Sequence, residues 1–209
     1  MTSEDAPADP AQDLDQGRPP VRVLDTGAVK ALAHPIRVAI YDIISQYGPQ
    51  TASSLAERLG ESTGATSYHL RALAKHDLIR EVAGRGTARE RWWERPAGAV
   101  SFAAPGGMPT IAGRAAMQLV MSSLYDRRHQ QLMQFVTSGN DTEPEQWQDA
   151  ALISTANVRL TAAQLADVSA RIAAVIDETV DRYRDQSGED VRPVTIRADL
   201  FPLAEGDQS

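Results

Sequence analysis

The chain reads TASSLAERLGESTGATSYHLRALAKH from Thr51 to His76, and this stretch decides the fold of the N-terminal half. It contains two short segments in which apolar residues recur every three or four positions, so that they share one side of a helix in each segment. The tight turn Gly60-Glu61-Ser62 separates the two segments. We therefore predict two short helices joined by a turn, which is a helix-turn-helix unit.

Capping residues set the bounds of both helices. Thr51 can cap the first helix over residues 52–59, since a threonine hydroxyl accepts a hydrogen bond from an unpaired N–H of the first turn. Gly60 suits the end of that helix. Ser62 can cap the second helix, which we predict over residues 63–76.

The second helix leaves a small, hydrogen-bonding face exposed near its N-terminus. Leu70 and Leu73 point inward, and the outward positions are then Thr63, Gly64, Ser67, Tyr68 and Arg71. A bulky or acidic face would clash with the major groove of DNA or be repelled by it, and this face is neither. We predict that these five residues contact DNA.

Two further helical patterns precede this unit. The first can be capped by Asp25 or Thr26 and runs to about Ala33. The second starts at Pro35, where the missing N–H of proline costs nothing, and Gly48-Pro49 stops it.

A basic hairpin is predicted after the second helix of the unit. Residues 78–82 and 88–94 read as its two strands, and residues 83–87 read as a turn bracketed by glycines. Arg85 falls at the predicted tip, with Arg89 close by. Such a hairpin beside a recognition helix is a wing, and we predict that these two arginines contact phosphates or the minor groove.

Four ordered motifs within residues 26–95 resemble the ArsR family of winged-helix repressors. They are ALAHPIR (31–37), LAERLG (55–60), TSYHLRAL (66–73) and HDLI (76–79). The resemblance implies a homodimeric transcription factor that reads a pseudo-palindromic operator in double-stranded DNA. By position, it implies contacts of Ser67 and Tyr68 with bases or phosphates, a phosphate contact of Arg71, and a packing role for His69.

The sequence departs from the metal-sensing members of that family, because the cysteine ligands of their recognition helix are absent. The chain has no cysteine at all, which excludes disulfides and thiol catalysis. Its four histidines do not supply three or four convergent ligands. No nucleophile elbow, phosphate loop or His-Glu-x-x-His motif appears. We therefore expect no metal, no cofactor and no enzymatic activity.

The charge of the chain is divided by region. The net charge of −7 results from −4 over residues 1–19, +3 over residues 20–95 and −6 over residues 96–209. A basic segment thus lies between acidic ones, an arrangement that keeps a DNA-binding face attractive and weakens non-specific binding elsewhere. We predict a disordered acidic tail over residues 1–20 and a loose end over 204–209.

Residues 108–203 are predicted to form a C-terminal domain of helices and a strand–helix–strand unit. The expected elements are a helix over 109–136, a short helix capped by Thr142 and Glu145, strands at 156–160 and 194–200, and a helix from Thr161 to about Gln186. The methionines of the first of these helices fit a ligand-pocket wall or, more simply, a dimer or domain core. We expect dimer contacts here and leave a small-molecule effector site open.

The predicted fold class is mainly α with a small β part: a winged helix-turn-helix domain over residues 21–103 and a C-terminal helical or α+β domain. The function we expect is that of a cytoplasmic, sequence-specific DNA-binding regulator, dimeric and repressing. No signal peptide or membrane-spanning run is seen in the sequence. The alternative is a winged-helix protein-interaction module that no longer binds DNA, because fold alone does not decide function.

Overall fold

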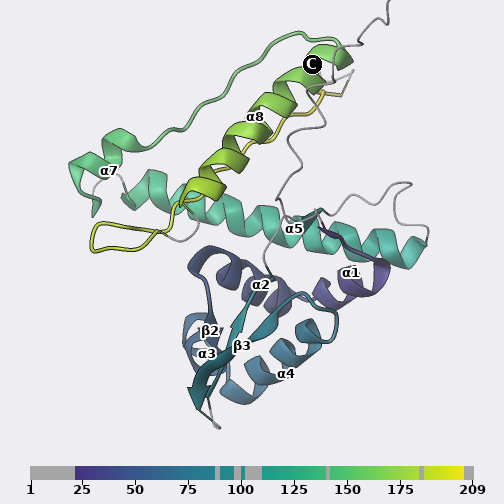
Figure 1. Cartoon of the computed structure of the whole chain (residues 1–209). Coiled ribbons are helices and arrows are strands. Elements are labelled where there is room, and N and C mark those ends of the chain that lie inside the picture. Colours follow the sequence, from purple (N-terminus) through teal and green to yellow (C-terminus); the bar gives the residue numbers. More distant parts are fainter. Residues whose placement is uncertain are drawn as a thin grey trace, which may run out of the picture. The chain divides into compact units, whose positions relative to one another are not determined.

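The computed structural model describes residues 22–87, 90–96, 100–101, 110–139, 142–183 and 186–204. The protein is mainly helical with a small antiparallel sheet, which confirms the predicted fold class (Figure 1). Two compact units divide the chain, the first ending at Val136 and the second beginning at Thr137. The predicted acidic tail and Arg89 lie outside the described residues, as do residues 205–209.

The first unit is built from five helices and five short strands among the described residues. The helices are α1 (Thr26–Leu32), α2 (Pro35–Tyr47), α3 (Ala52–Leu59), α4 (Thr63–Ala74) and α5 (Ile111–Gln134). The strands are β1 (Arg22–Val23), β2 (Gln50–Thr51), β3 (Arg80–Thr87), β4 (Glu90–Glu94) and β5 (Val100–Ser101). Strands β2, β4 and β3 form an antiparallel sheet in that order, and β1 pairs in parallel with β5.

The predicted caps form at the helix starts. The hydroxyl of Thr51 accepts from the N–H of Ser54 at 3.1 Å, and that of Ser62 accepts from Ala65 at 3.2 Å. At the other end α4 stops at Ala74, two residues earlier than predicted. No glycine marks this end in the sequence.

One hydrophobic core joins all five helices. Leu55 of α3 and Leu70 and Leu73 of α4 are completely buried, and Val120 of α5 reaches the same cluster. Thr66, also fully buried, donates its hydroxyl hydrogen to the carbonyl oxygen of Ala52 at 2.8 Å. This bond links α4 to the start of α3 and fixes the angle of the helix-turn-helix.

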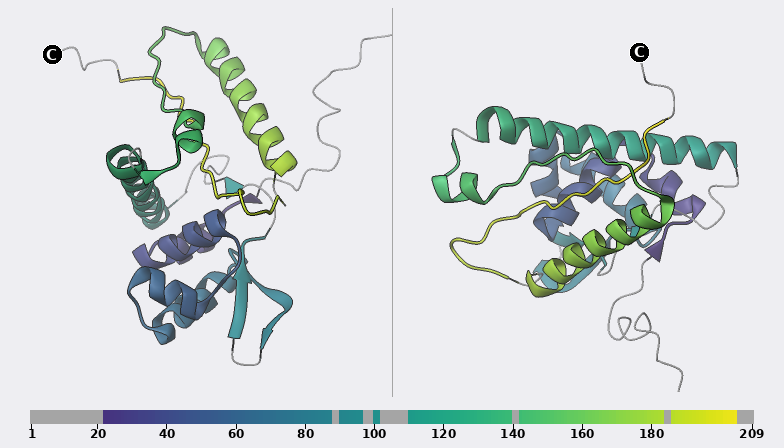
Figure 2. Two further views of the ribbon diagram at one scale, coloured as in Figure 1. Left: turned by 90° about the vertical axis from the view of Figure 1, so that its left-hand side faces the viewer. Right: turned by 90° about the horizontal axis from the view of Figure 1, so that it is seen from above.

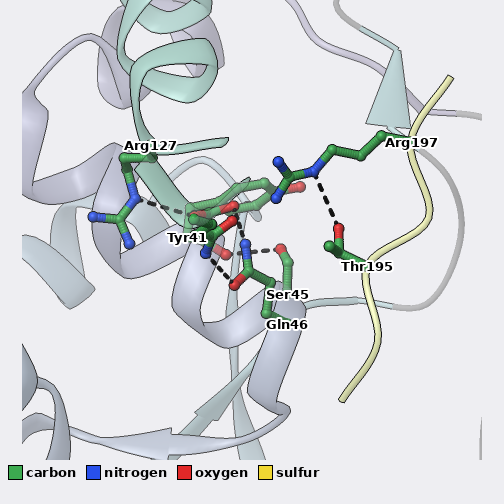
Figure 3. Close-up of polar contacts among 8 residues, drawn as sticks. Tyr41, Ser45, Gln46, Arg127, Thr195 and Arg197 are labelled. Atoms are coloured by element: carbon green, nitrogen blue, oxygen red, sulfur yellow. Dashed lines mark hydrogen bonds and ion pairs between the residues drawn. The ribbon is translucent and has the colours of Figure 1, made fainter. Parts of the chain in front are cut away.

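Polar contacts hold α5 on α2, on the side away from α4 and the sheet (Figures 1 and 3). Nε of Arg127 lies 3.1 Å from a carboxylate oxygen of the largely buried Asp42. Beside this pair, Gln131 donates to Gln46 at 2.8 Å, and Gln46 donates to Asp42 at 2.9 Å. Helix α5 therefore packs as part of the first unit. The sequence-based assignment of residues 108–203 to one domain stays a prediction.

The wing differs from its prediction in the place where the chain reverses. The hairpin projects from the helices (Figure 2), and Thr87 pairs with Glu90, so the expected turn at 83–87 lies inside β3. The strand register shifts between Glu81 and Gly86. Gly84 and Gly86 have φ angles of +71° and +103°, so their left-handed conformations make an irregular strand instead of a reversal.

Gly86 offers a direct test of this geometry. A Cβ added there would collide with the carbonyl oxygen of Glu90, whereas a Cβ on Gly84 would meet no atom within 4 Å. Both positions carry the strain of a positive φ, about 1–3 kcal/mol for a non-glycine residue. We expect Gly86→Ala to lower the free energy of unfolding by more than Gly84→Ala, as measured by chemical denaturation. Equal losses would contradict the close approach.

The second unit contains α7 (Glu145–Ala150) and α8 (Ala162–Tyr183), and the π-helical turn η1 (Phe135–Gly139) connects α5 to it. The capping box at the start of α8 forms as expected, with Thr161 and Gln164 bonded reciprocally at 2.9 and 3.2 Å. The one expected at Thr142 does not form, because α7 has Pro144 as its N-cap and no side-chain cap bond. The hydroxyl of Thr142 instead donates to the carbonyl oxygen of Ser138 at 2.9 Å.

The strands predicted at 156–160 and 194–200 are wrong, because the structure has no regular element in either stretch. Their alternating side chains are exposed, as in Val158 (71%) and Val194 (69%). Alternation specifies which face of a strand is apolar, but a strand also needs a hydrogen-bonding neighbour, and two isolated strands are marginal. No described residue of the second unit is buried.

Candidate nucleic-acid interface

Helix α4 presents the predicted contact residues on its outer side. Thr63, Gly64 and Arg71 are exposed, and Tyr68 is 66% exposed, whereas Ser67 is half-buried. Tyr68 contacts His69 edge-on through its ring but stays largely exposed. Its ring and hydroxyl are available to a partner, as a residue that binds in a groove must be.

The inner side of α4 holds this face rigid. The buried Leu70 and Leu73 and the hydroxyl bond of Thr66 fix the helix against α3. On the outside, Nε of Arg71 donates to the carbonyl oxygen of Ser67 at 3.1 Å, which directs the guanidinium along the helix surface. The helix contains no carboxylate between Thr63 and Ala74, so nothing on it repels a polyanion.

The arginines of the wing fall into two groups. Arg80 pairs with Glu94 at 2.8 Å and Arg91 with Glu81 at 3.3 Å, so carboxylates on the facing strand balance their charges. Arg85 instead places its guanidinium carbon 3.7 Å from the centre of the Trp92 ring.

That stacking leaves the charge of Arg85 without a carboxylate partner among the described residues. The aromatic face attracts the cation but does not neutralise it. Arg85 therefore fits the role predicted for the wing, although it lies within β3 and not at the tip.

Sequence reasoning assigned no contact to the start of α2, where three polar residues gather beside α4. The imidazole of His34 caps α2 by accepting from the N–H of Ile36 at 3.3 Å. The ring of His69 lies 4.7 Å from that of His34, and Arg37 is half-buried next to them. We call these three residues the α2 cluster. The one signal in the sequence is Arg37, a single cation among the apolar residues of the first turns of α2.

Burial sets the protonation of His69 in the α2 cluster. Desolvation lowers the pKa of His69, and the neighbouring His34 and Arg37 lower it further, against the carboxylate of Glu61, which raises it. The buried Nδ1 atom of His69 has no hydrogen-bond partner. The imidazole is therefore kept neutral at neutral pH, and the packing role that we expected for His69 agrees with its 8% exposure.

A pH dependence of stability follows from the lowered pKa of His69. In the unfolded chain this imidazole takes up a proton near its ordinary pKa of about 6.5, but the folded protein resists protonation until lower pH. The unfolded state therefore binds more protons in this window, and stability falls as the pH falls through it. We expect the free energy of unfolding to drop more between about pH 7.5 and pH 5.5 in the wild type than in His69→Gln.

The other three histidines are present in both proteins, so the difference isolates His69. Denaturant titrations at the two pH values measure it. The same pH dependence in both proteins would show that His69 titrates normally in the folded state.

Two negative observations concern the residues that the structure describes. No group of three or more His, Cys, Asp or Glu side chains in this part of the chain is arranged to hold a metal ion. None of its helices combines the length and the apolar character that crossing a bilayer requires.

Comparison with known families agrees with the helix-turn-helix of the first unit. Residues 32–82 match the family described as a helix-turn-helix domain. The search of curated proteins gave no match. Among solved structures, a transcriptional regulator from Thermotoga maritima is similar, with 12% identity, a TM-score of 0.29, and coverage of 77% of this chain and 90% of that one. Residues 32–82, which contain α2, α3, α4 and the start of the wing, are thus a helix-turn-helix domain.

Proposed function

We propose that the chain is a sequence-specific DNA-binding transcriptional regulator of the ArsR type, which acts as a homodimeric repressor at a pseudo-palindromic operator. The observation that carries this proposal is the outer face of α4, which is exposed, rich in hydrogen-bonding groups and free of carboxylates. A helix with these properties, second in a helix-turn-helix, suits the major groove of DNA.

In this proposal the site residues take two roles. Thr63, Gly64, Ser67 and Tyr68 face bases and nearby phosphates in the major groove, while Arg71 binds a phosphate. On the wing, Arg85 and Arg89 bind the backbone or the minor groove. The balanced pairs of Arg80 and Arg91 instead stabilise the hairpin.

The remaining regions take supporting roles in the same proposal. Residues 21–103 form the DNA-binding domain, and residues 108–203 supply dimer contacts and a place for a small-molecule effector. The regulator acts in the cytoplasm without a metal or cofactor. Its acidic flanking regions reduce binding to DNA outside the operator by repulsion from phosphates.

Recovery of bound DNA tests the proposal. The full-length protein is incubated with sheared genomic DNA of its own organism, and the retained fragments are sequenced. Fluorescence anisotropy then compares an enriched duplex with a scrambled duplex of equal composition, from about 50 to about 200 mM salt. We expect an inverted repeat with half-sites about 10 base pairs apart, bound about 1,000-fold more tightly than the scrambled sequence.

Equal affinity for both duplexes, or no binding at the lowest salt, would contradict the proposal. Absence of binding would favour a winged-helix module that contacts other proteins. Sedimentation of the free protein and of the complex tests the homodimer separately.

A further inference from the structure

Arg37 in the first turn of α2 is a cation that the fold leaves without an acceptor. Its Nε atom is buried and has no hydrogen-bond partner, and no ion pair joins the side chain to any described residue. The residue as a whole is half-buried, so part of it still reaches the surface. Burial lowers the pKa of Arg37, whereas the phenol of Tyr68 raises it.

The surroundings of Arg37 supply almost no negative charge. His34 and His69 of the α2 cluster are imidazoles, and Glu61, the carboxylate that acts on His69, precedes α4. The 13-residue helix α2 also directs its N-terminus here, which adds partial positive charge. His69 is only 8% exposed, and its buried Nδ1 has no hydrogen-bond partner. Polar partners are therefore lacking at this place for a second side chain as well.

Such an arrangement is costly in the free protein. A partly buried guanidinium without hydrogen bonds loses hydration that nothing in the chain replaces. The cost is recovered when an anion supplies the missing acceptor, and a phosphate matches the fork of the guanidinium by accepting two N–H bonds at once. A helix N-terminus favours the same ligand.

Tyr68 places this cation within the DNA-binding face. Its ring is exposed, it follows Ser67 on α4, and it lies in T-shaped contact with His69 at 5.3 Å between ring centres. Tyr68 also acts electrostatically on Arg37, so the two side chains are neighbours. A duplex that receives Tyr68 in its groove therefore brings its backbone to the start of α2.

We propose that Arg37, at the N-terminus of α2, binds a backbone phosphate of the operator next to the groove that receives Tyr68. This inference rests on the function proposed above and adds to it a fourth basic residue, on a third element besides α4 and the wing. The contact anchors the domain but does not contribute to sequence specificity, since the phosphates of the backbone are the same at every position.

The substitution Arg37→Met tests the proposal, because it keeps the length and apolar packing of the side chain and removes the charge. Anisotropy titrations are made with the operator and with the scrambled duplex at several salt concentrations. We expect about a tenfold loss of affinity for both duplexes and a decrease of about 0.9 in the slope of log affinity against log salt, the value of one phosphate. Thermal stability should be unchanged or higher, since an unpaired, half-buried cation is gone.

Lys30→Met is the matched control. Lys30 is an exposed cation of α1, a helix that packs against α5, and its removal should leave the salt slope unchanged. An unchanged slope in Arg37→Met, with a wild type that binds its operator, would overturn this inference alone. A wild type that binds no DNA would overturn the proposed function as well.

A free anion is the competing occupant. Inorganic phosphate is added to the wild type and to Arg37→Met, with sodium chloride at equal ionic strength as the reference. A rise in melting temperature that is specific to phosphate and requires Arg37, together with an unchanged salt slope for DNA in Arg37→Met, would assign the site to a small anion and overturn the backbone contact. Equal melting temperatures in phosphate and chloride are expected.

Discussion

The double variant Tyr68→Ala, Arg71→Ala is expected to bind the operator about 30-fold or more weakly than the wild type, since each good DNA contact contributes about 1–3 kcal/mol. Both side chains are exposed on α4 and outside the core. Their removal should therefore change the free energy of unfolding by less than about 0.5 kcal/mol each. The loss would thus come from the interface and not from the fold.

The single variants divide this loss into two kinds. Without Tyr68 the ratio between operator and scrambled affinity should fall, if the ring contacts bases. Without Arg71 both affinities should fall together, and the salt slope should decrease by about 0.9. Lys75 is exposed just beyond the C-terminus of α4, so Lys75→Ala is the control. This variant should bind both duplexes as the wild type does. Unchanged operator affinity in the double variant would refute α4 as the recognition helix.

Leu70→Ala is expected to lower the free energy of unfolding by about 2–5 kcal/mol, the usual cost of truncating a buried leucine. Leu70 is completely buried in the cluster that joins the helices of the first unit. The substitution removes its apolar contacts and leaves a cavity between α4 and its neighbours. Urea denaturation followed by circular dichroism measures the loss.

The same substitution at an exposed leucine provides the comparison. Leu152 of the second unit is 85% exposed, so Leu152→Ala should change stability by less than about 0.5 kcal/mol. A small effect at Leu70 would show that α4 is not held by this core. We expect a substitution at Tyr68 to change DNA binding and one at Leu70, two positions further on the same helix, to change stability. A small effect at Leu70 would contradict this division.

The helices were predictable because their determinants are local. Thr51 and Ser62 cap the helices that they were expected to cap, and Leu70 and Leu73 occupy the inward positions that their spacing assigned. Each of these signals depends on residues within one or two turns of helix. The end of α4 lacked such a signal: Asp77, with φ of +52°, adopts the left-handed conformation for which the sequence offers no glycine.

The errors arose where the outcome depends on distant parts of the chain. Gly84 and Gly86 read as a turn, but left-handed glycines fit an irregular strand equally well, and pairing with β4 decides between the two. Residues 156–160 and 194–200 have the alternation of strands but no partner strand. The lack of a hydrogen-bond acceptor at Arg37 is likewise a property of α2 and α4 packed together, and no linear pattern shows it.

The absence of any buried residue in the described part of the second unit has a calorimetric consequence. The heat-capacity increment of unfolding comes mainly from apolar surface that becomes hydrated. For the single chain, most of that surface belongs to the core formed by α1 to α5. The heat-capacity increment of unfolding should therefore be close to the value for a protein the size of the first unit, which ends at Val136, and smaller than the value for a globular protein of 209 residues.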